Sequence, residues 1–149
     1  WRSLLRMGVP DREAEDLAQD VFVVVMRRYD DYDPSRPIKP WLFGITYNVV
    51  RGWSRRASTR SEHLSELEPD APRTDPGIRA VEAAQLVHRA LRAVPEERRA
   101  VFSLYELDKV PMAEVARALS IPTNTAYSRL RVARAEFREA VELLKGGEG

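Results

Sequence analysis

Residues 112–137, MAEVARALSIPTNTAYSRLRVARAEF, contain the pattern that decides the fold. Apolar residues at helical spacing predict a short helix over residues 112–119 and a second helix from Thr123 onward. Residues 120–122, Ser-Ile-Pro, predict a tight turn between them. The small side chain of Ala116 lets the two helices cross closely. This arrangement is typical of a helix-turn-helix motif.

The second helix of this motif carries polar and basic side chains opposite its apolar face. Short polar groups near a helix N-terminus can reach base edges in the major groove, and arginines reach phosphates or guanine. The candidate duplex-contacting residues are Thr125, Tyr127, Ser128, Arg129, Arg131 and Arg134. A plain helical hairpin with a solvated arginine face is the alternative to DNA binding.

The rest of the chain is also predicted to be helical, which gives an all-α fold class without an internal repeat or strand pair. The first strong helix has Asp11 as its N-cap, and its inward stripe consists of Ala14, Leu17, Ala18, Val21 and Phe22. Residues 32–40, YDPSRPIKP, carry three prolines and predict an ordered loop. Pro40 then opens a second helix, in which Trp41 and Trp53 are assigned to core packing. Further helices are expected after Asp75-Pro76 and after Pro95.

The net charge of +1 does not by itself indicate binding to nucleic acid. The distribution of charge along the chain, however, separates three segments. Residues 1–57 hold 10 basic and 8 acidic residues, residues 58–78 hold 2 and 5, and residues 79–149 hold 12 and 10. Two mildly basic helical domains, residues 1–57 and 78–149, are therefore expected, joined by a flexible acidic linker over residues 58–77.

Several classes of protein are excluded by composition. The chain has no cysteine, hence no disulfide or thiolate metal site. The apolar run from Val21 to Met26 is too short to span a bilayer, and no secretory signal is visible, so a cytoplasmic protein is expected. His63 and His88 lack partners at ligand spacing, and no Gly-rich phosphate loop is present. We therefore expect no metal, cofactor, small-molecule substrate or catalysis.

Residues 91–139 resemble region 4 of sigma factors along their whole length. The family has a Leu-Pro-Glu opening, a Glu-Ile-Ala first helix and a Gly-Thr-Val-Lys-Ser-Arg-Leu recognition start. This chain has Val94-Pro95-Glu96, then Glu114-Val115-Ala116, then Asn-Thr-Ala-Tyr-Ser-Arg-Leu over residues 124–130. Relatives usually carry Lys or Arg where Tyr127 stands, so their sequence preference does not simply transfer.

Residues 12–56 resemble region 2 of the same family, with its Asp-Leu-x-Gln-Glu-x-Phe core, aspartate-proline loop, Trp-Leu pair and Asn followed by basic residues. Direct attachment of regions 2 and 4 is typical of the small extracytoplasmic-function group. The resemblance implies a region 2 helical bundle over residues 1–57 and a region 4 helix-turn-helix domain over residues 78–149. The first residue is Trp1 rather than Met, so region 2 is expected to be truncated at its N-terminus.

The resemblance implies a transcription initiation factor that binds core RNA polymerase, recognises the minus-thirty-five and minus-ten promoter elements and promotes melting. Docking on the clamp helices of the largest polymerase subunit would use Asp16, Gln19, Asp20 and Phe22. Region 4 would bind the flap of the second-largest subunit. The alternative for the acidic residues is a favourable interaction with the dipole of their own helix.

The minus-ten element must be melted, and exposed bases need pockets and stacking surfaces. The loop over residues 32–40 resembles the family's capture loop for a flipped base. The candidate residues for minus-ten DNA are Tyr32, Arg36, Lys39, Asn48, Arg51, Arg55 and Arg56. The family often has Asp at the position of Gly52, so the family's exact minus-ten preference does not simply transfer to this chain.

The resemblance also implies an anti-sigma protein that hides the polymerase-binding faces and can hold the chain at the membrane. The linker acids Glu62, Glu66, Glu68, Asp70 and Asp75 suit either a basic RNA exit channel or a solvated tether. Two other functions stay open. One is a helix-turn-helix regulator that dimerises on palindromic sites. The other is a sigma-like decoy that occupies polymerase or a regulator without reading DNA.

Overall fold

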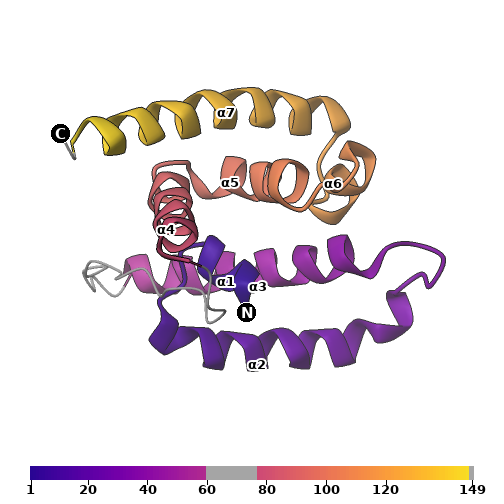
Figure 1. Ribbon diagram of the computed structural model, residues 1–149. Helices are drawn as coiled ribbons and strands as arrows, with labels where there is room; N and C mark the ends of the chain where they lie inside the picture. Colours follow the sequence, from indigo (N-terminus) through magenta and orange to yellow (C-terminus); the bar gives the residue numbers. More distant parts are fainter. Residues whose placement is uncertain (60–76, 148–149) are drawn as a thin grey trace.

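The computed structural model describes residues 1–59 and 77–147, and every regular element in them is helical (Figure 1). The predicted all-α class is therefore confirmed. The linker acids from Glu62 to Asp75, and the helix start expected at Asp75-Pro76, lie outside the described residues. None of the described helices is long and apolar enough to cross a membrane.

The N-terminal half, residues 1–59, folds into three helices and one short turn. These are α1 (Arg2–Arg6), α2 (Asp11–Arg28), the 3-10 turn η1 (Tyr29–Asp31) and α3 (Ile38–Thr59). The short helix α1 was not expected from the sequence. Pro10, not Asp11, is the N-cap of α2, and Asp11 lies in the first turn, where a negative charge favours the helix dipole.

The second main helix begins two residues earlier than expected, at Ile38 instead of Pro40. Pro40 is the third residue of α3 and is buried. The first four N–H groups of a helix have no partner inside it, so the missing N–H of proline costs nothing there. The proline-rich loop is therefore present but shorter than predicted, because it covers residues 32–37 instead of 32–40.

The C-terminal half, residues 77–147, contains α4 (Ile78–Arg92), α5 (Glu96–Phe102), the π-helical turn η2 (Ser103–Leu107), α6 (Met112–Ala118) and α7 (Thr123–Gly146). The helix expected after Pro95 is present, but it changes to π-helical winding at Ser103. Figure 1 shows these elements as layers, with α7 outermost, then α4, α5 and α6, then α3, and α2 on the opposite side.

The two halves share one continuous cluster of buried apolar side chains. Leu17 of α2 and Val50 of α3 belong to the same cluster as Leu104, Val115 and Leu130 of the C-terminal half. Fully burying one such side chain contributes about 1.5–3 kcal/mol. The sequence predicted two small domains on a linker, and the structure adds that they pack directly against each other.

The predicted turn between α6 and α7 is present, and its backbone is unusual at Ser120. This residue has a φ of 54°, the left-handed conformation that favours glycine. The N–H of Ile121 donates to the carbonyl of Ala116 at 3.0 Å, and the N–H of Ser120 donates to the carbonyl of Arg117 at 3.2 Å. This is the Schellman pattern, in which a left-handed residue ends a helix.

Replacing Ser120 by glycine is expected to raise the free energy of unfolding by about 0.5–1 kcal/mol, because glycine adopts this conformation without a steric penalty. Thermal unfolding followed by circular dichroism measures the change. Ala135→Gly, at an exposed position inside α7, is the matched control and should destabilise by about 1 kcal/mol. Equal effects of the two glycines would contradict a strained turn at Ser120.

Candidate nucleic-acid and polymerase interfaces

The recognition face predicted on the second helix of the helix-turn-helix lies at the start of α7. Ala126, Leu130 and Ala133 are buried against the core, so the opposite face of the helix points outward. Tyr127, with 52 % of its surface exposed, Ser128 and Arg131 lie on the exposed face, and Thr125 is half-buried beside them.

Two of the six candidates on α7 are held by acidic side chains of their own half. Arg129 lies 3.8 Å from a carboxylate oxygen of Glu97. Arg134 forms an ion pair with Glu106, and its guanidinium lies 5.7 Å from the centre of the Tyr105 ring. The residues that are most available for duplex DNA are therefore Tyr127, Ser128 and Arg131.

The loop between α2 and α3 is locally ordered by its own side chains. The Asp33 carboxylate accepts hydrogen bonds from the hydroxyl and the backbone N–H of Ser35, at 2.6 and 2.9 Å, and these bonds lower the pKa of Asp33. The hydroxyl of Tyr32 donates to the backbone carbonyl of Arg36 at 2.8 Å. The ring of Tyr32 lies 5.1 Å from that of Trp41, centre to centre. The loop therefore presents a preformed aromatic surface.

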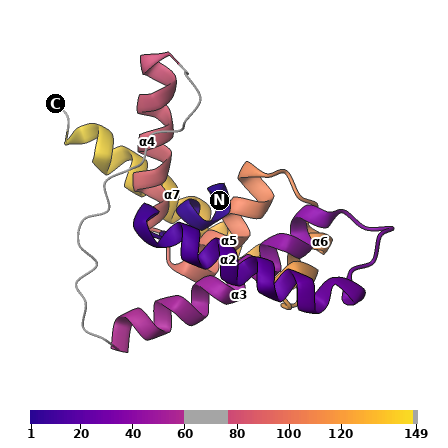
Figure 2. The same cartoon turned by 90° about the horizontal axis from the view of Figure 1, so that it is seen from below.

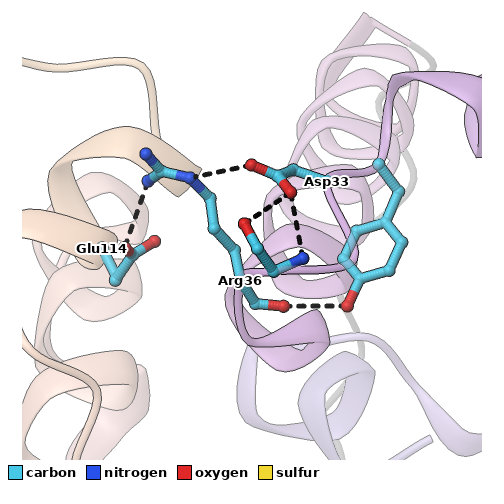
Figure 3. Close-up of polar contacts among 5 residues, drawn as sticks. Asp33, Arg36 and Glu114 are labelled. Atoms are coloured by element: carbon cyan, nitrogen blue, oxygen red, sulfur yellow. Dashed lines mark hydrogen bonds and ion pairs between the residues drawn. The ribbon is translucent and has the colours of Figure 1, made fainter.

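A cavity of about 290 Å³ opens beside this loop. The predicted minus-ten residues Tyr32, Arg36 and Asn48 all line it. Its opposite wall comes from Glu114, Arg117 and Ala118 of α6 and from Ser120 in the turn that follows. Figure 3 shows the Arg36 guanidinium between two carboxylates, at 3.5 Å from Asp33 and 3.3 Å from Glu114. The structure thus brings the loop and α3 together around one cavity, and a role of these residues in binding DNA stays a prediction.

Trp41 is a residue whose place the sequence reasoning missed. We assigned both tryptophans to core packing. Trp53 does pack against the core, and its indole N–H donates to Glu13. Trp41 is half-buried and lines the cavity next to Tyr32. Its position directly after the proline loop, within the family's Trp-Leu pair, was the available signal.

The remaining minus-ten candidates follow Asn48 along α3. Arg51 follows Asn48 by three residues and Arg55 follows Arg51 by four, so both arginines lie on the same face of α3 as Asn48. Arg51 lies 5.4 Å from the centre of the Tyr47 ring and 3.9 Å from Glu97. Burial raises the pKa of Tyr47, against the influence of the Arg51 cation. Arg55 and Arg56 are exposed, whereas Lys39 lies away from this face, 3.2 Å from Asp108.

The predicted polymerase-binding residues lie on the outer side of α2. Asp16, Gln19, Asp20 and Phe22 are all exposed. The sequence also placed Phe22 on the inward stripe of this helix, and that assignment is wrong, since 70 % of its surface is exposed. Val23 and Met26 extend the exposed apolar surface along α2, and Tyr29 continues it into η1. We call Phe22, Val23, Met26 and Tyr29 the outer apolar stripe.

Within residues 1–59 and 77–147, no group of three or more His, Cys, Asp or Glu side chains could hold a metal ion. His63 lies outside the described residues. Burial lowers the pKa of His88, and the nearby Arg92 and Arg6 cations add to the effect. The described histidine therefore favours its neutral form and has the environment of a packed side chain.

Both halves match known protein families. Residues 1–60 match the family described as sigma-70 region 2, and residues 84–137 match sigma-70, region 4. RNA polymerase sigma factor CnrH of Cupriavidus metallidurans is 30 % identical over 141 residues, which cover 87 % of this chain and 74 % of CnrH. The chain belongs to the RNA polymerase sigma factors. The ECF RNA polymerase sigma-E factor of Escherichia coli K12 is 24 % identical over 154 residues, covering 95 % of this chain and 81 % of that protein, which agrees with the extracytoplasmic-function group.

Solved structures agree with the fold of this sigma factor. The sigma factor RpoE, in complex with the anti-sigma factor NepR from Bartonella quintana, has a TM-score of 0.75 at 20 % identity and covers 95 % of this chain and 88 % of its own. CnrH in complex with the cytosolic domain of CnrY has a TM-score of 0.65 at 25 % identity, covering 95 % and 79 %. The order of the two regions predicted from sequence is therefore confirmed.

Proposed function

We propose that this sigma factor directs core RNA polymerase to promoters through two separate DNA-binding surfaces. Residues 78–149 read the minus-thirty-five element as duplex, and residues 1–57 bind the melted minus-ten element, with residues 58–77 as the connection. The observation that carries the proposal is the exposed face of Tyr127, Ser128 and Arg131 at the start of α7, in a chain that contains both sigma regions. Polar side chains at this position of a helix-turn-helix enter the major groove.

Binding to polymerase is proposed for the outer side of α2 and for the flap-binding surface of region 4. Acidic residues next to an exposed apolar stripe suit a partner surface with basic and apolar groups. Phe22 and Met26, at 70 % and 76 % exposure, are the most protruding members of the stripe. An apolar surface of this kind on a free protein usually marks a binding site.

Control by an anti-sigma protein is the second part of the proposal. The CnrH relative was solved with the cytosolic domain of CnrY, and RpoE with the anti-sigma factor NepR. A protein of that kind would cover the polymerase-binding surfaces, and a membrane-bound one would hold the chain at the membrane. We further propose that the chain acts in the cytoplasm, where polymerase is present, and that it is not itself an enzyme and needs no cofactor.

The test is to mix the chain with core RNA polymerase and measure co-elution, then run-off transcription on fragments of its source genome. Specific new start sites would support the proposal. Polymerase binding without transcription would favour a decoy, and dimeric binding to palindromes without polymerase would favour a helix-turn-helix regulator. Asp16→Ala should reduce co-elution, whereas Arg55→Ala should leave it intact and reduce open-complex formation.

Replacing Arg131 by alanine is expected to weaken binding to minus-thirty-five duplex about three- to tenfold and to reduce the slope of log affinity against log salt by about one. The reason is that Arg131 is exposed on the recognition face and can neutralise one phosphate. Fluorescence anisotropy with a promoter fragment from the run-off assay measures both quantities. Arg138→Ala, an exposed arginine further along α7, is the matched control. A loss of the same size in the control would mean a non-specific charge effect.

A further inference from the structure

Two large apolar side chains are exposed within the first ten residues of α7. Tyr127 has 52 % of its surface exposed and Val132 has 40 %. Tyr127 is one of the candidates for duplex DNA, whereas Val132 was not among them. In Figures 1 and 2 the start of α7 lies beside α6, and its C-terminal end lies on the opposite side of the molecule. The exposed apolar pair is therefore at the helix-turn-helix end of α7.

The two side chains border the recognition face on either side. Successive residues of a helix are rotated by about 100° around its axis. By this rotation Arg131 and Ser128, both exposed, lie between Tyr127 and Val132 on the side of α7 that points away from the core. The recognition face is therefore polar in its middle and apolar at both borders.

The fold does not account for either apolar side chain. In residues 1–59 and 77–147, neither Tyr127 nor Val132 belongs to the buried apolar cluster or packs against it. The hydroxyl and the ring of Tyr127 also have no partner in that part of the chain. Valine is a poorer helix former than alanine, so Val132 does not strengthen α7. Single exposed apolar residues are common, but here both lie on a face proposed to enter DNA.

The major groove of duplex DNA offers one apolar group to such side chains. Its base edges present hydrogen-bond donors and acceptors, and thymine adds a 5-methyl group. The side chain of Val132 has neither a donor nor an acceptor, so the thymine methyl is the group of a base edge that it contacts favourably. The ring of Tyr127 packs against a methyl in the same way, and its hydroxyl can bond a neighbouring base edge or phosphate.

The dimensions of α7 and of the groove allow both contacts at once. A helix with its side chains is about 10–12 Å across, and the major groove is about 12 Å wide. Side chains at both borders of the recognition face therefore reach base edges. Val132 follows Tyr127 by five residues, a rise of about 7.5 Å along the helix axis. This rise equals about two base-pair steps of roughly 3.4 Å, so the two side chains contact different base pairs.

We infer that Tyr127 and Val132 are specificity-determining residues, which select two thymines of the minus-thirty-five element through their 5-methyl groups. This inference rests on the proposed reading of duplex DNA by α7. Arg131 and Ser128, between them, contact phosphate and polar base edges. A cytosine or guanine at either thymine position places polar base groups against an apolar side chain, where they lose water without gaining a hydrogen bond.

The methyl contacts are tested by replacing thymine with uracil in the minus-thirty-five duplex. Uracil pairs with adenine as thymine does and lacks only the 5-methyl group. The duplex is a promoter fragment from the run-off assay, with every thymine replaced in the minus-thirty-five segment that the chain protects from nuclease. Each buried methyl contributes about three- to fivefold in affinity. We therefore expect about ten- to twentyfold weaker binding of the full chain by fluorescence anisotropy, and no change when uracil lies only outside that segment.

Protein variants connect the effect of the methyls to the two side chains. Tyr127→Ala/Val132→Ala should bind the thymine duplex about ten- to twentyfold more weakly than the wild-type chain, and should bind thymine and uracil duplexes equally. Val132→Ala should keep a uracil penalty of about three- to fivefold. Leu143→Ala, exposed near the other end of α7, is the matched apolar control and should keep the full penalty. Circular dichroism should show unchanged folding, since all three side chains are exposed.

A uracil penalty that is present in the wild-type chain and in Leu143→Ala, and absent in the double variant, would support the inference. An equal penalty in the double variant would overturn it, because the methyls would then act through the shape of the DNA. Run-off transcription without any uracil penalty would overturn the inference and keep the sigma function.

Two further outcomes concern the partner of this face. Weaker binding of Val132→Ala to core polymerase, at unchanged affinity for the thymine duplex, would overturn the inference in favour of a protein-binding face. A chain that neither binds polymerase nor drives transcription, and that recognises no specific duplex, would overturn the proposed function and the inference with it.

Discussion

The Arg99→Ala variant is expected to lose about 2–4 kcal/mol of the free energy of unfolding, although Arg99 touches no proposed ligand. Its guanidinium donates to the backbone carbonyl of Val94 from two nitrogens, at 2.9 and 3.1 Å, and to the carbonyl of Met7 at 2.9 Å. Met7 belongs to the N-terminal half and Val94 to the C-terminal half. Removing the guanidinium leaves both carbonyls without this donor at a largely buried position.

The environment of Arg99 supports this expectation. Burial lowers the pKa of Arg99, while the nearby Glu96 carboxylate acts in the opposite direction and Arg92 adds to the lowering. Arginine stays protonated in proteins at neutral pH, so the cation is held in place by the carbonyls and Glu96. Gly8, with a φ of 88°, makes room for it, since a Cβ there would lie 3.0 Å from the guanidinium.

Thermal unfolding measures the effect, and the loss corresponds to a decrease of about 5–15 °C in Tm for a chain of this length. Arg99→Lys should recover only part of it, because one ammonium group cannot replace the planar fork. Arg98→Ala is the neighbouring control. Arg98 pairs with Glu136 inside the C-terminal half, with side-chain exposures of 34 % and 24 %, so its loss removes no contact between the halves. Equal decreases for Arg98 and Arg99 would argue against a buried tie between the halves.

Much of the fold could be predicted because it depends on local patterns. The spacing of Leu130, Ala133 and Phe137 defines one face of α7, and Ser-Ile-Pro defines the turn before it. The prolines at 34 and 37 end the loop where α3 begins. Periodicity, turn residues and prolines act over a few positions, so the sequence displays them directly.

The packing of the two halves could not be predicted in this way. The pairing of Arg36 with Glu114 joins residues 78 positions apart, and no local pattern marks either residue as a partner of the other. Nor does any local pattern show that the missing side chain of Gly44 allows the approach of Ala118. In the sequence Arg99 looks like the other arginines, because its partner carbonyl on Met7 lies 92 positions away.

The candidate site was predicted in part for the same reason. The candidates on α7 were chosen from the polar face of the predicted helix, and those on α2, the loop and α3 from the resemblance. The division between available and paired residues came from geometry. Among the α7 candidates, Arg131 is exposed while Arg134 is paired with Glu106. On α2 the apolar run VFVVVM contains more large side chains than one inward stripe can bury. That excess was the signal for the outer apolar stripe.

Replacing Phe22 by alanine is expected to weaken binding to core polymerase by about 30-fold or more, which corresponds to about 2 kcal/mol. Aromatic side chains that protrude from a free protein and become buried in a complex often contribute this much. Phe22 is 70 % exposed, so the same substitution should leave Tm almost unchanged. Titration of labelled chain with core polymerase gives the affinity. Leu143→Ala, with 71 % exposure at the end of α7, is the matched apolar control.

The acidic residues beside the stripe are expected to act differently from Phe22. Asp16→Ala/Asp20→Ala should mainly slow association, and its effect should shrink as salt is raised, because exposed charges steer encounters and are screened. The loss in Phe22→Ala should persist at high salt, because it arises from apolar burial. If the loss in Phe22→Ala also disappeared at high salt, or if Tm fell with it, the outer apolar stripe would not be a docking surface for polymerase. Phe22 would then stabilise α2 within the chain itself.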